Sequence, residues 1–73
     1  MDLIKIGKYI AEKRKALGLT QKQLAEKLNM SDKSVSKWER GICLPDVSIY
    51  MELCSILRIS INEFLAGEDI GAE

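Results

Sequence analysis

The stretch TQKQLAEKLNMSDKSVSKWERG, residues 20–41, decides how this 73-residue chain folds. It predicts two short helices joined by a tight turn. The first helix opens with a capping box, in which Thr20 and Gln23 satisfy backbone N–H groups that the first turn leaves unpaired. Asn29 tolerates the left-handed conformation that often ends a helix, and Ser31 is a suitable N-cap for the second helix.

Each of the two expected helices has an apolar face. Leu24, Ala25 and Leu28 fall on one side of the first helix at helical spacing. Val35 and Trp38 lie one turn apart on the second helix, so we assign Trp38 to core packing rather than to base stacking. The opposite face of the second helix carries Asp32, Lys33, Ser36, Lys37 and Arg40. A short helix with a polar, basic outer face can enter a DNA major groove, which is about 12 Å wide.

This stretch resembles the helix-turn-helix of the phage-repressor and Cro family, also called the XRE-type family. The residues that carry the resemblance are Thr20, Gln21, Leu24, Ala25, Leu28, Ser31, Ser34, Val35, Trp38, Glu39, Gly41 and Pro45. The likeness extends over roughly residues 6–65, and it departs from the family at Asn29, where the family usually has Gly. It implies sequence-specific binding of double-stranded DNA by a transcriptional regulator, with repression by occupying an operator as the favoured action.

The outward residues divide into those that would read bases and those that would hold phosphates. A lysine can donate to guanine and an aspartate can accept from cytosine. We therefore expect base contacts from Asp32, Lys33, Ser36 and Lys37. Asp32 is the weakest of these candidates, because phosphates repel a carboxylate that the first turn of a helix favours for dipole reasons alone.

The expected phosphate contacts come from Gln21, Lys22, Ser34 and Arg40. The family resemblance also implies this role for Gln21, whose amide we expect to face outward at the start of its helix. The alternatives are an ordinary helix former at Gln21 and a solvated hydroxyl at Ser34. The resemblance further implies an ion pair between Arg14 and Glu39 that would lock the first helix of the chain to the second motif helix. The alternative there is two independent surface charges.

The rest of the chain predicts three further helices and therefore an all-α, compact five-helix bundle, which the family resemblance implies is lambda-repressor-like. Apolar spacing predicts helices over residues 3–17 and 47–57, and a capping box at Ser60 predicts another over residues 61–66. In the loop before Asp46, which we expect to cap the fourth helix, Ile42 and Leu44 should tuck under the bundle. We expect residues 1–67 to form the DNA-binding domain and residues 68–73 a frayed acidic tail.

Charge is distributed unevenly along a chain whose formal net charge is zero. Residues 1–45 contain ten Lys or Arg against five acidic residues, whereas residues 46–73 contain one basic residue against six acidic ones. A polarised molecule can turn its basic side toward a polyanion. The alternative is an ordinary solvated surface with an acidic tail, so the charge pattern supports DNA binding only together with the motif.

Other classes of function find little support in the sequence. The chain has no His, so no His-based triad or His metal site is possible, and we expect no enzyme, no metal and no cofactor. Cys43 and Cys54 lie eleven positions apart, which predicts free thiols, Cys54 in the core and Cys43 in a loop. No apolar run approaches the roughly 20 residues that cross a bilayer, and the start of the chain lacks a signal-peptide pattern, so we expect a cytoplasmic protein.

Two questions about partners remain open in the sequence. The same bundle serves equally well as a protein-interaction or antitoxin module without DNA reading, although such a module should show apolar anchors on the outer face of the second motif helix. Tight operator binding needs two copies on a pseudo-palindrome, so we expect a homodimer on DNA. An apolar patch formed by Met51, Ile59, Ile61 and Ile70 is our candidate for the contact, and ordinary core residues are the alternative.

Overall fold

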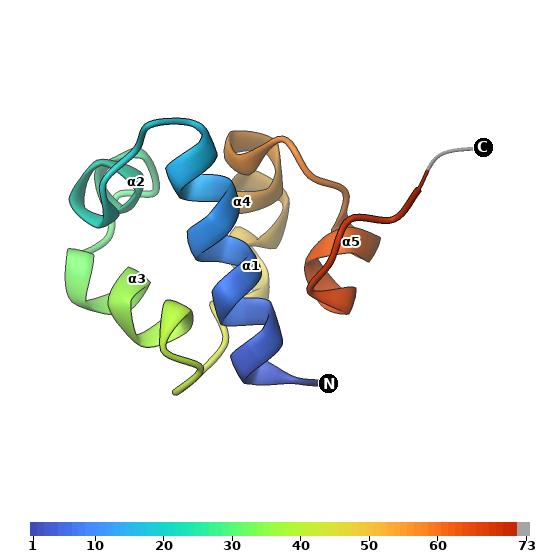
Figure 1. Cartoon of the computed structure of the whole chain (residues 1–73). Coiled ribbons are helices and arrows are strands. Elements are labelled where there is room, and N and C mark those ends of the chain that lie inside the picture. Colours follow the sequence, from blue (N-terminus) through green and yellow to red (C-terminus); the bar gives the residue numbers. More distant parts are fainter. Residues whose placement is uncertain (72–73) are drawn as a thin grey trace.

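The computed structural model describes residues 1–71, and all regular structure in that part of the chain is helical. The elements in chain order are α1 (Leu3–Ala16), α2 (Gln21–Lys27), α3 (Asp32–Glu39), a 3₁₀ turn η1 (Val47–Ile49), α4 (Tyr50–Leu57) and α5 (Ile61–Ala66). Helix α1 is central, since it packs against α3, α4 and α5, while α2 packs on α3 (Figure 1). The predicted all-helical fold with five α-helices is confirmed.

Most helices begin at a side-chain cap that the sequence supplies locally. Thr20 and Ser60 each form a complete capping box with the residue three positions on. Asp2 accepts a hydrogen bond from the Lys5 backbone N–H, and Ser31 accepts one from the backbone of Ser34. These caps fix where α1, α2, α3 and α5 start, because they satisfy N–H groups that the first turn leaves unpaired.

The prediction of one continuous α-helix over residues 47–57 is wrong for the first turn. Asp46 does act as a cap, but its carboxylate accepts from Ser48 at 3.0 Å, and the Ile49 N–H returns to the Asp46 carbonyl at 3.0 Å. This is the tighter i→i+3 pattern of a 3₁₀ turn, so α4 proper starts only at Tyr50. At the other end of the chain, α1 stops at Ala16, one residue earlier than expected.

Left-handed residues close several of the helices. Asn29 has φ 60°, as the sequence predicted for the end of the first motif helix. Arg58, at the end of α4, also has a positive φ of 61°. Nothing about arginine signals this conformation, so the sequence does not predict it.

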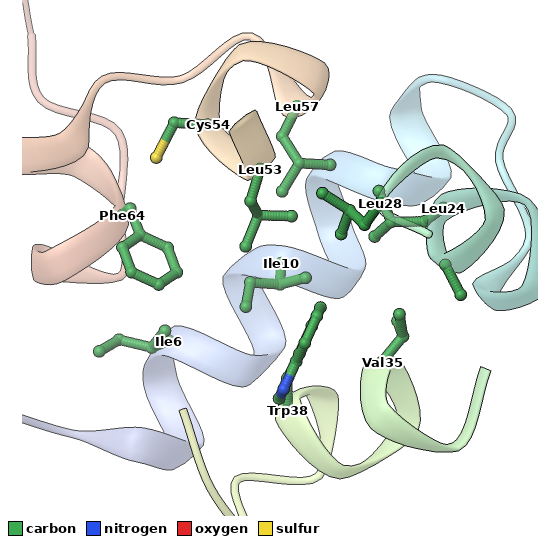
Figure 2. Packing of buried hydrophobic residues seen from close by; sticks show 11 residues of the cluster. Ile6, Ile10, Leu24, Leu28, Val35, Trp38, Leu53, Cys54, Leu57 and Phe64 are labelled. Atoms are coloured by element: carbon green, nitrogen blue, oxygen red, sulfur yellow. The ribbon is translucent and has the colours of Figure 1, made fainter. Parts of the chain in front are cut away.

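One hydrophobic core joins all five helices. Its fully buried large side chains are Ile6, Ile10, Leu24, Val35, Leu53, Leu57 and Phe64. Figure 2 shows Trp38 reaching from α3 toward α1 within this cluster, and Trp38 is 4% exposed, so its assignment to the core is confirmed. Phe64 packs edge-on against Tyr50, with ring centroids 4.9 Å apart. Cys54 is buried and Cys43 is exposed, both as free thiols.

Two expectations about the ends of the bundle are wrong. Ile42 is 56% exposed, because the turn that closes α3 bonds its N–H to the Lys37 carbonyl and carries the side chain to solvent, whereas Leu44 packs against the core as expected. Residues 68–70 do not fray, since Glu68 forms an ion pair with Lys5 at 2.6 Å and the segment lies along α1. The last two residues of the expected tail lie outside the described part of the chain.

A second set of contacts holds this C-terminal segment. The Tyr9 hydroxyl donates to the Asp69 carboxylate at 2.7 Å, and Lys13 lies 2.8 Å from the same oxygen. The Ile70 N–H donates to Glu63 at 3.1 Å. Burial and the neighbouring Asp69 raise the pKa of the Tyr9 hydroxyl, which therefore stays a neutral donor.

Candidate nucleic-acid interface

The two faces of α3 differ sharply in exposure. Val35 and Trp38 are 0% and 4% exposed on the inner face, where they meet α1 and α2. On the outer face Asp32, Lys33 and Lys37 are exposed. Arg40, also predicted for the outer face, is exposed, whereas Ser36 is half-buried. The predicted phosphate contact Ser34 is half-buried as well. The outer face of α3 is therefore polar along its whole length and carries no exposed apolar anchor.

Close packing of α2 on α3 presents this face. Ala25 is buried and small, which lets the two helices approach, and its carbonyl accepts the Met30 backbone N–H at 2.8 Å. The left-handed Asn29 reverses the chain just before that bond. The turn between the helices is thus closed by backbone geometry, and it fixes the angle at which α3 projects from the bundle.

A buried ion pair ties α3 back to α1. Arg14 Nε donates to Glu39 Oε2 at 2.6 Å and the terminal nitrogen Nη2 donates to Oε1 at 2.9 Å, while Nη1 donates to the Leu19 carbonyl at 2.8 Å. The two side chains are only 10% and 6% exposed. Hydrogen bonding to the Glu39 carboxylate raises the pKa of Arg14, so this guanidinium stays charged. The structure thus brings together the pair that the family resemblance implied.

Gln21 does not point freely outward as expected. Its amide nitrogen donates to Glu39 Oε1 at 2.9 Å, and the residue is half-buried. The start of α2 is therefore joined to the end of α3 and, through Glu39, to Arg14. No signal in the sequence indicated this contact, because it depends on a Glu39 oxygen that comes from another helix and has a lone pair beyond the one that Arg14 uses. The phosphate role of Gln21 stays a prediction.

Arg40 and Ser36 lie one turn apart and contact each other. The Arg40 Nε donates to the Ser36 hydroxyl at 3.2 Å and to its carbonyl at 3.3 Å. The guanidinium consequently lies along the outer side of α3, over the turn that precedes it. Lys22 is exposed at the start of α2. The predicted base-contacting and phosphate-contacting residues thus lie on α2, on α3 and at the end of α3, and their individual roles stay predictions.

No group of three or more His, Cys, Asp or Glu side chains in the described part of the chain is arranged to hold a metal ion. None of the helices between residues 1 and 71 is long and apolar enough to span a membrane.

Comparison with known proteins places this geometry in a family. A family model described as helix-turn-helix matches residues 10–64. The chain belongs to the helix-turn-helix family. The match covers both motif helices and most of the bundle around them, so the XRE-type resemblance drawn from the sequence is confirmed, as is the predicted class of domain, a DNA-binding domain of transcription regulators.

Individual members of the helix-turn-helix family agree with this assignment. The HTH-type transcriptional regulator ImmR of Bacillus subtilis is 36% identical over 64 residues, which cover 88% of this chain and 50% of that protein. The cryptic phage CTXphi transcriptional repressor RstR of Vibrio cholerae is 37% identical over 60 residues, 82% of this chain and 54% of that protein. This chain thus spans about half the length of the curated relatives it matches.

The helix-turn-helix fold itself matches solved structures. The crystal structure of the restriction-modification controller protein C.AhdI from Aeromonas hydrophila is 32% identical, with a TM-score of 0.77 over 86% of this chain and 96% of that one. The family and these relatives are regulators rather than enzymes.

Proposed function

We propose that this helix-turn-helix domain binds operator DNA with α3 in the major groove, and that the protein regulates transcription by occupying that operator. The observation that carries the proposal is the contrast on α3, where Val35 and Trp38 are buried while Lys33 and Lys37 face solvent. A helix held this way can enter the groove without losing its own packing. The favoured outcome of occupancy is repression.

The proposed roles follow from chemistry and position. Base contacts come from the outer face of α3, that is from Asp32, Lys33, Ser36 and Lys37. Phosphate contacts come from residues at its edges and at the start of α2, namely Gln21, Lys22, Ser34 and Arg40. The Gln23 N–H is already bonded to the Thr20 hydroxyl. A phosphate oxygen at the start of α2 would therefore meet the backbone N–H groups of Gln21 and Lys22.

A homodimer on a pseudo-palindromic operator completes the proposal. One domain offers few base contacts, and two copies reading half-sites about 34–36 Å apart would supply the rest. Apolar side chains exposed on or beside α4 and α5 support a contact there: Val47, Met51, Ile61, Leu65 and Ile70. We call these five residues the α4–α5 surface. Ile59, a member of the apolar patch expected from the sequence, is half-buried and packs against the core, so it is not part of this surface.

Selection of bound sequences from a random duplex pool tests the proposal directly. Once a preferred site is known, Lys33→Ala and Lys37→Ala should each weaken binding and relax base preference, since one base contact discriminates by about 1–3 kcal/mol. Lys8→Ala is the matched control, because it removes the same charge from an exposed position on α1 outside the motif. Binding is measured by fluorescence anisotropy at two salt concentrations.

The outcomes distinguish an error in the residue roles from an error in the proposed function. If both lysine variants keep the wild-type base preference, the reading roles are wrong. If the wild-type protein shows no preference in the pool and no affinity for any duplex at low salt, DNA reading itself is wrong and the protein-interaction alternative replaces it.

We also infer a cytoplasmic site of action, where the two free thiols stay reduced.

A further inference from the structure

Backbone meets backbone where α1 crosses the end of α3. A Cβ atom built on Gly7 would lie 2.3 Å from the Trp38 carbonyl oxygen and 2.8 Å from that of Glu39. A second glycine lies nearby, just after α3: a Cβ built on Gly41 would lie 2.8–2.9 Å from atoms of Ile4 on α1. Both distances are shorter than side-chain carbons tolerate, so two missing side chains create this contact.

Gly7 needs this explanation more than Gly41 does. Gly41 has φ 75°, a conformation that favours glycine wherever it occurs. Gly7 lies inside α1 with helical geometry, and glycine is the poorest helix former after proline. Gly7 is also buried, so solvent exposure does not account for it. What distinguishes the position is the pair of carbonyl groups that lie against it.

We infer that Gly7 is a positioning residue for DNA reading, because it sets how closely the end of α3 lies on α1. Trp38 and Glu39 are the last two residues of α3. The Glu39 side chain reaches on to Arg14, so α1 holds this end of α3 at two places, by contact at Gly7 and by the ion pair at Arg14. The inference rests on the proposed function, since it concerns the placement of the helix that would read bases.

A methyl group at position 7 must move the helices apart. Ordinary contacts begin at 3.4 Å, so the 2.3 Å approach requires a shift of about 1 Å. The obstacle is a backbone carbonyl, which cannot rotate away as a side chain can. Binding groups act within about 0.5 Å of their productive geometry. A shift of this size should therefore disturb hydrogen bonds to base edges, while long charged side chains still reach phosphates.

The experiment compares discrimination rather than affinity alone. Gly7→Ala and wild type are titrated against the selected duplex and a scrambled duplex, well below the midpoint of thermal unfolding. The matched control is Gly71→Ala, because nothing lies within 4 Å of a Cβ built there. Each protein is also prepared in an Arg58→Gly background. This substitution relieves a positive φ and should keep most of the protein folded. Trp38 is the single tryptophan, so its emission reports on the same junction.

The expected result is a loss of about tenfold in the ratio of selected to scrambled affinity, the size of one lost base contact. Affinity for the scrambled duplex should stay within about twofold to threefold, since it depends on phosphates. Trp38 emission should change, and Gly71→Ala should match wild type. A loss of folded protein alone would lower both affinities together and leave the ratio unchanged, so the ratio distinguishes positioning from stability.

Two results would overturn the inference while leaving the proposed function intact. One is a folded Gly7→Ala protein with the wild-type ratio. The other is a variant that stays unfolded in both backgrounds, which would make the glycine a requirement of folding rather than of helix placement. A wild-type protein with no discrimination would overturn the proposed function, and the inference with it.

Discussion

Arg14 carries a buried charge, and its energetics depend on the equally buried carboxylate of Glu39. Taking two charges out of water is costly, and only close geometry with satisfied hydrogen bonds offsets that cost. Here three guanidinium nitrogens and both carboxylate oxygens have partners within 2.9 Å. The pair therefore contributes geometry above all, because it joins α1 to the end of α3.

Removing one member of the ion pair should destabilise the domain far more than replacing both members with apolar side chains. Arg14→Met leaves the Glu39 carboxylate buried without its main partner, so the free energy of unfolding should fall by about 3–5 kcal/mol. The double variant Arg14→Met with Glu39→Met should recover most of that loss, since it buries no charge. Chemical denaturation monitored by circular dichroism measures both. Equal losses in the single and double variants would contradict this account.

Arg58 holds a left-handed backbone that arginine does not favour. Arg58→Gly should raise the free energy of unfolding by about 0.5–1 kcal/mol, because relief of the positive φ exceeds the extra flexibility of glycine in the unfolded chain. Arg58→Ala is the control, since alanine must adopt the same strained conformation and should bring no gain. If alanine stabilises the domain as much as glycine does, the arginine side chain rather than its backbone is the cause.

At the scale of single residues, the sequence predicts a conformation where the residue's own chemistry decides it. Asn29 could be placed in the left-handed region because asparagine adopts that conformation readily, whereas Arg58 could not, because only the tertiary structure imposes it there. Trp38 could be assigned to the core from its phase relative to Val35. The orientation of Gln21 could not be predicted, since it depends on a carboxylate oxygen that arrives from another helix.

Helix boundaries show the same division. The starts of α2 and α5 were predictable because each is fixed by a capping box within four residues of sequence. The 3₁₀ turn before α4 was not, because apolar spacing over residues 47–57 does not distinguish a 3₁₀ turn from a first α-helical turn. The attachment of residues 68–70 to α1 was missed for a different reason: its ion pairs join residues more than fifty positions apart.

This C-terminal attachment should make stability depend on pH. The Lys13 ammonium, and after it the Tyr9 hydroxyl, hold the pKa of Asp69 below its usual value. A lowered folded-state pKa means that the stabilisation is present above the unfolded value, about 3.9, and is lost as pH falls through the folded one. Asp69→Asn should therefore lower the Tm at pH 7, and this deficit should shrink as the pH falls through the folded-state pKa.

Thermal unfolding across that pH range checks the prediction. Lys13→Gln provides the matched variant, because it removes the other half of the ion pair. It should lower the Tm at pH 7 in the same direction, and the double variant should lose little more than either single one. An Asp69→Asn deficit that is as large at pH 2 as at pH 7 would show that the carboxylate charge is not the cause.

For the molecule as a whole, the proposed dimer can be tested without touching α3. Met51 is 78% exposed on α4, and in a twofold contact a lysine there would face its own copy or the apolar side chains around it. Met51→Lys should therefore weaken operator binding by about tenfold or more through loss of the second half-site contact, with an unchanged Tm. Sedimentation on the operator duplex measures how many copies bind.

Ala16→Lys is the control for this variant. It adds the same positive charge at an exposed position on α1, outside the α4–α5 surface. It should bind as tightly as wild type or slightly more tightly, because added positive charge favours DNA. Two copies of Met51→Lys on one operator with wild-type affinity would show that the contact lies elsewhere.

The local caps at Asp2, Thr20, Ser31 and Ser60 have a consequence for the speed at which the chain acquires its structure. Every α-helix except α4 carries its own starting signal, and neighbouring helices such as α2 and α3 pack directly on each other. Little loop-closure entropy must be spent before contacts form, which places such a bundle among proteins that fold in microseconds to milliseconds. A newly made copy would then bury its apolar side chains soon after the α5 segment leaves the ribosome, with little time to aggregate.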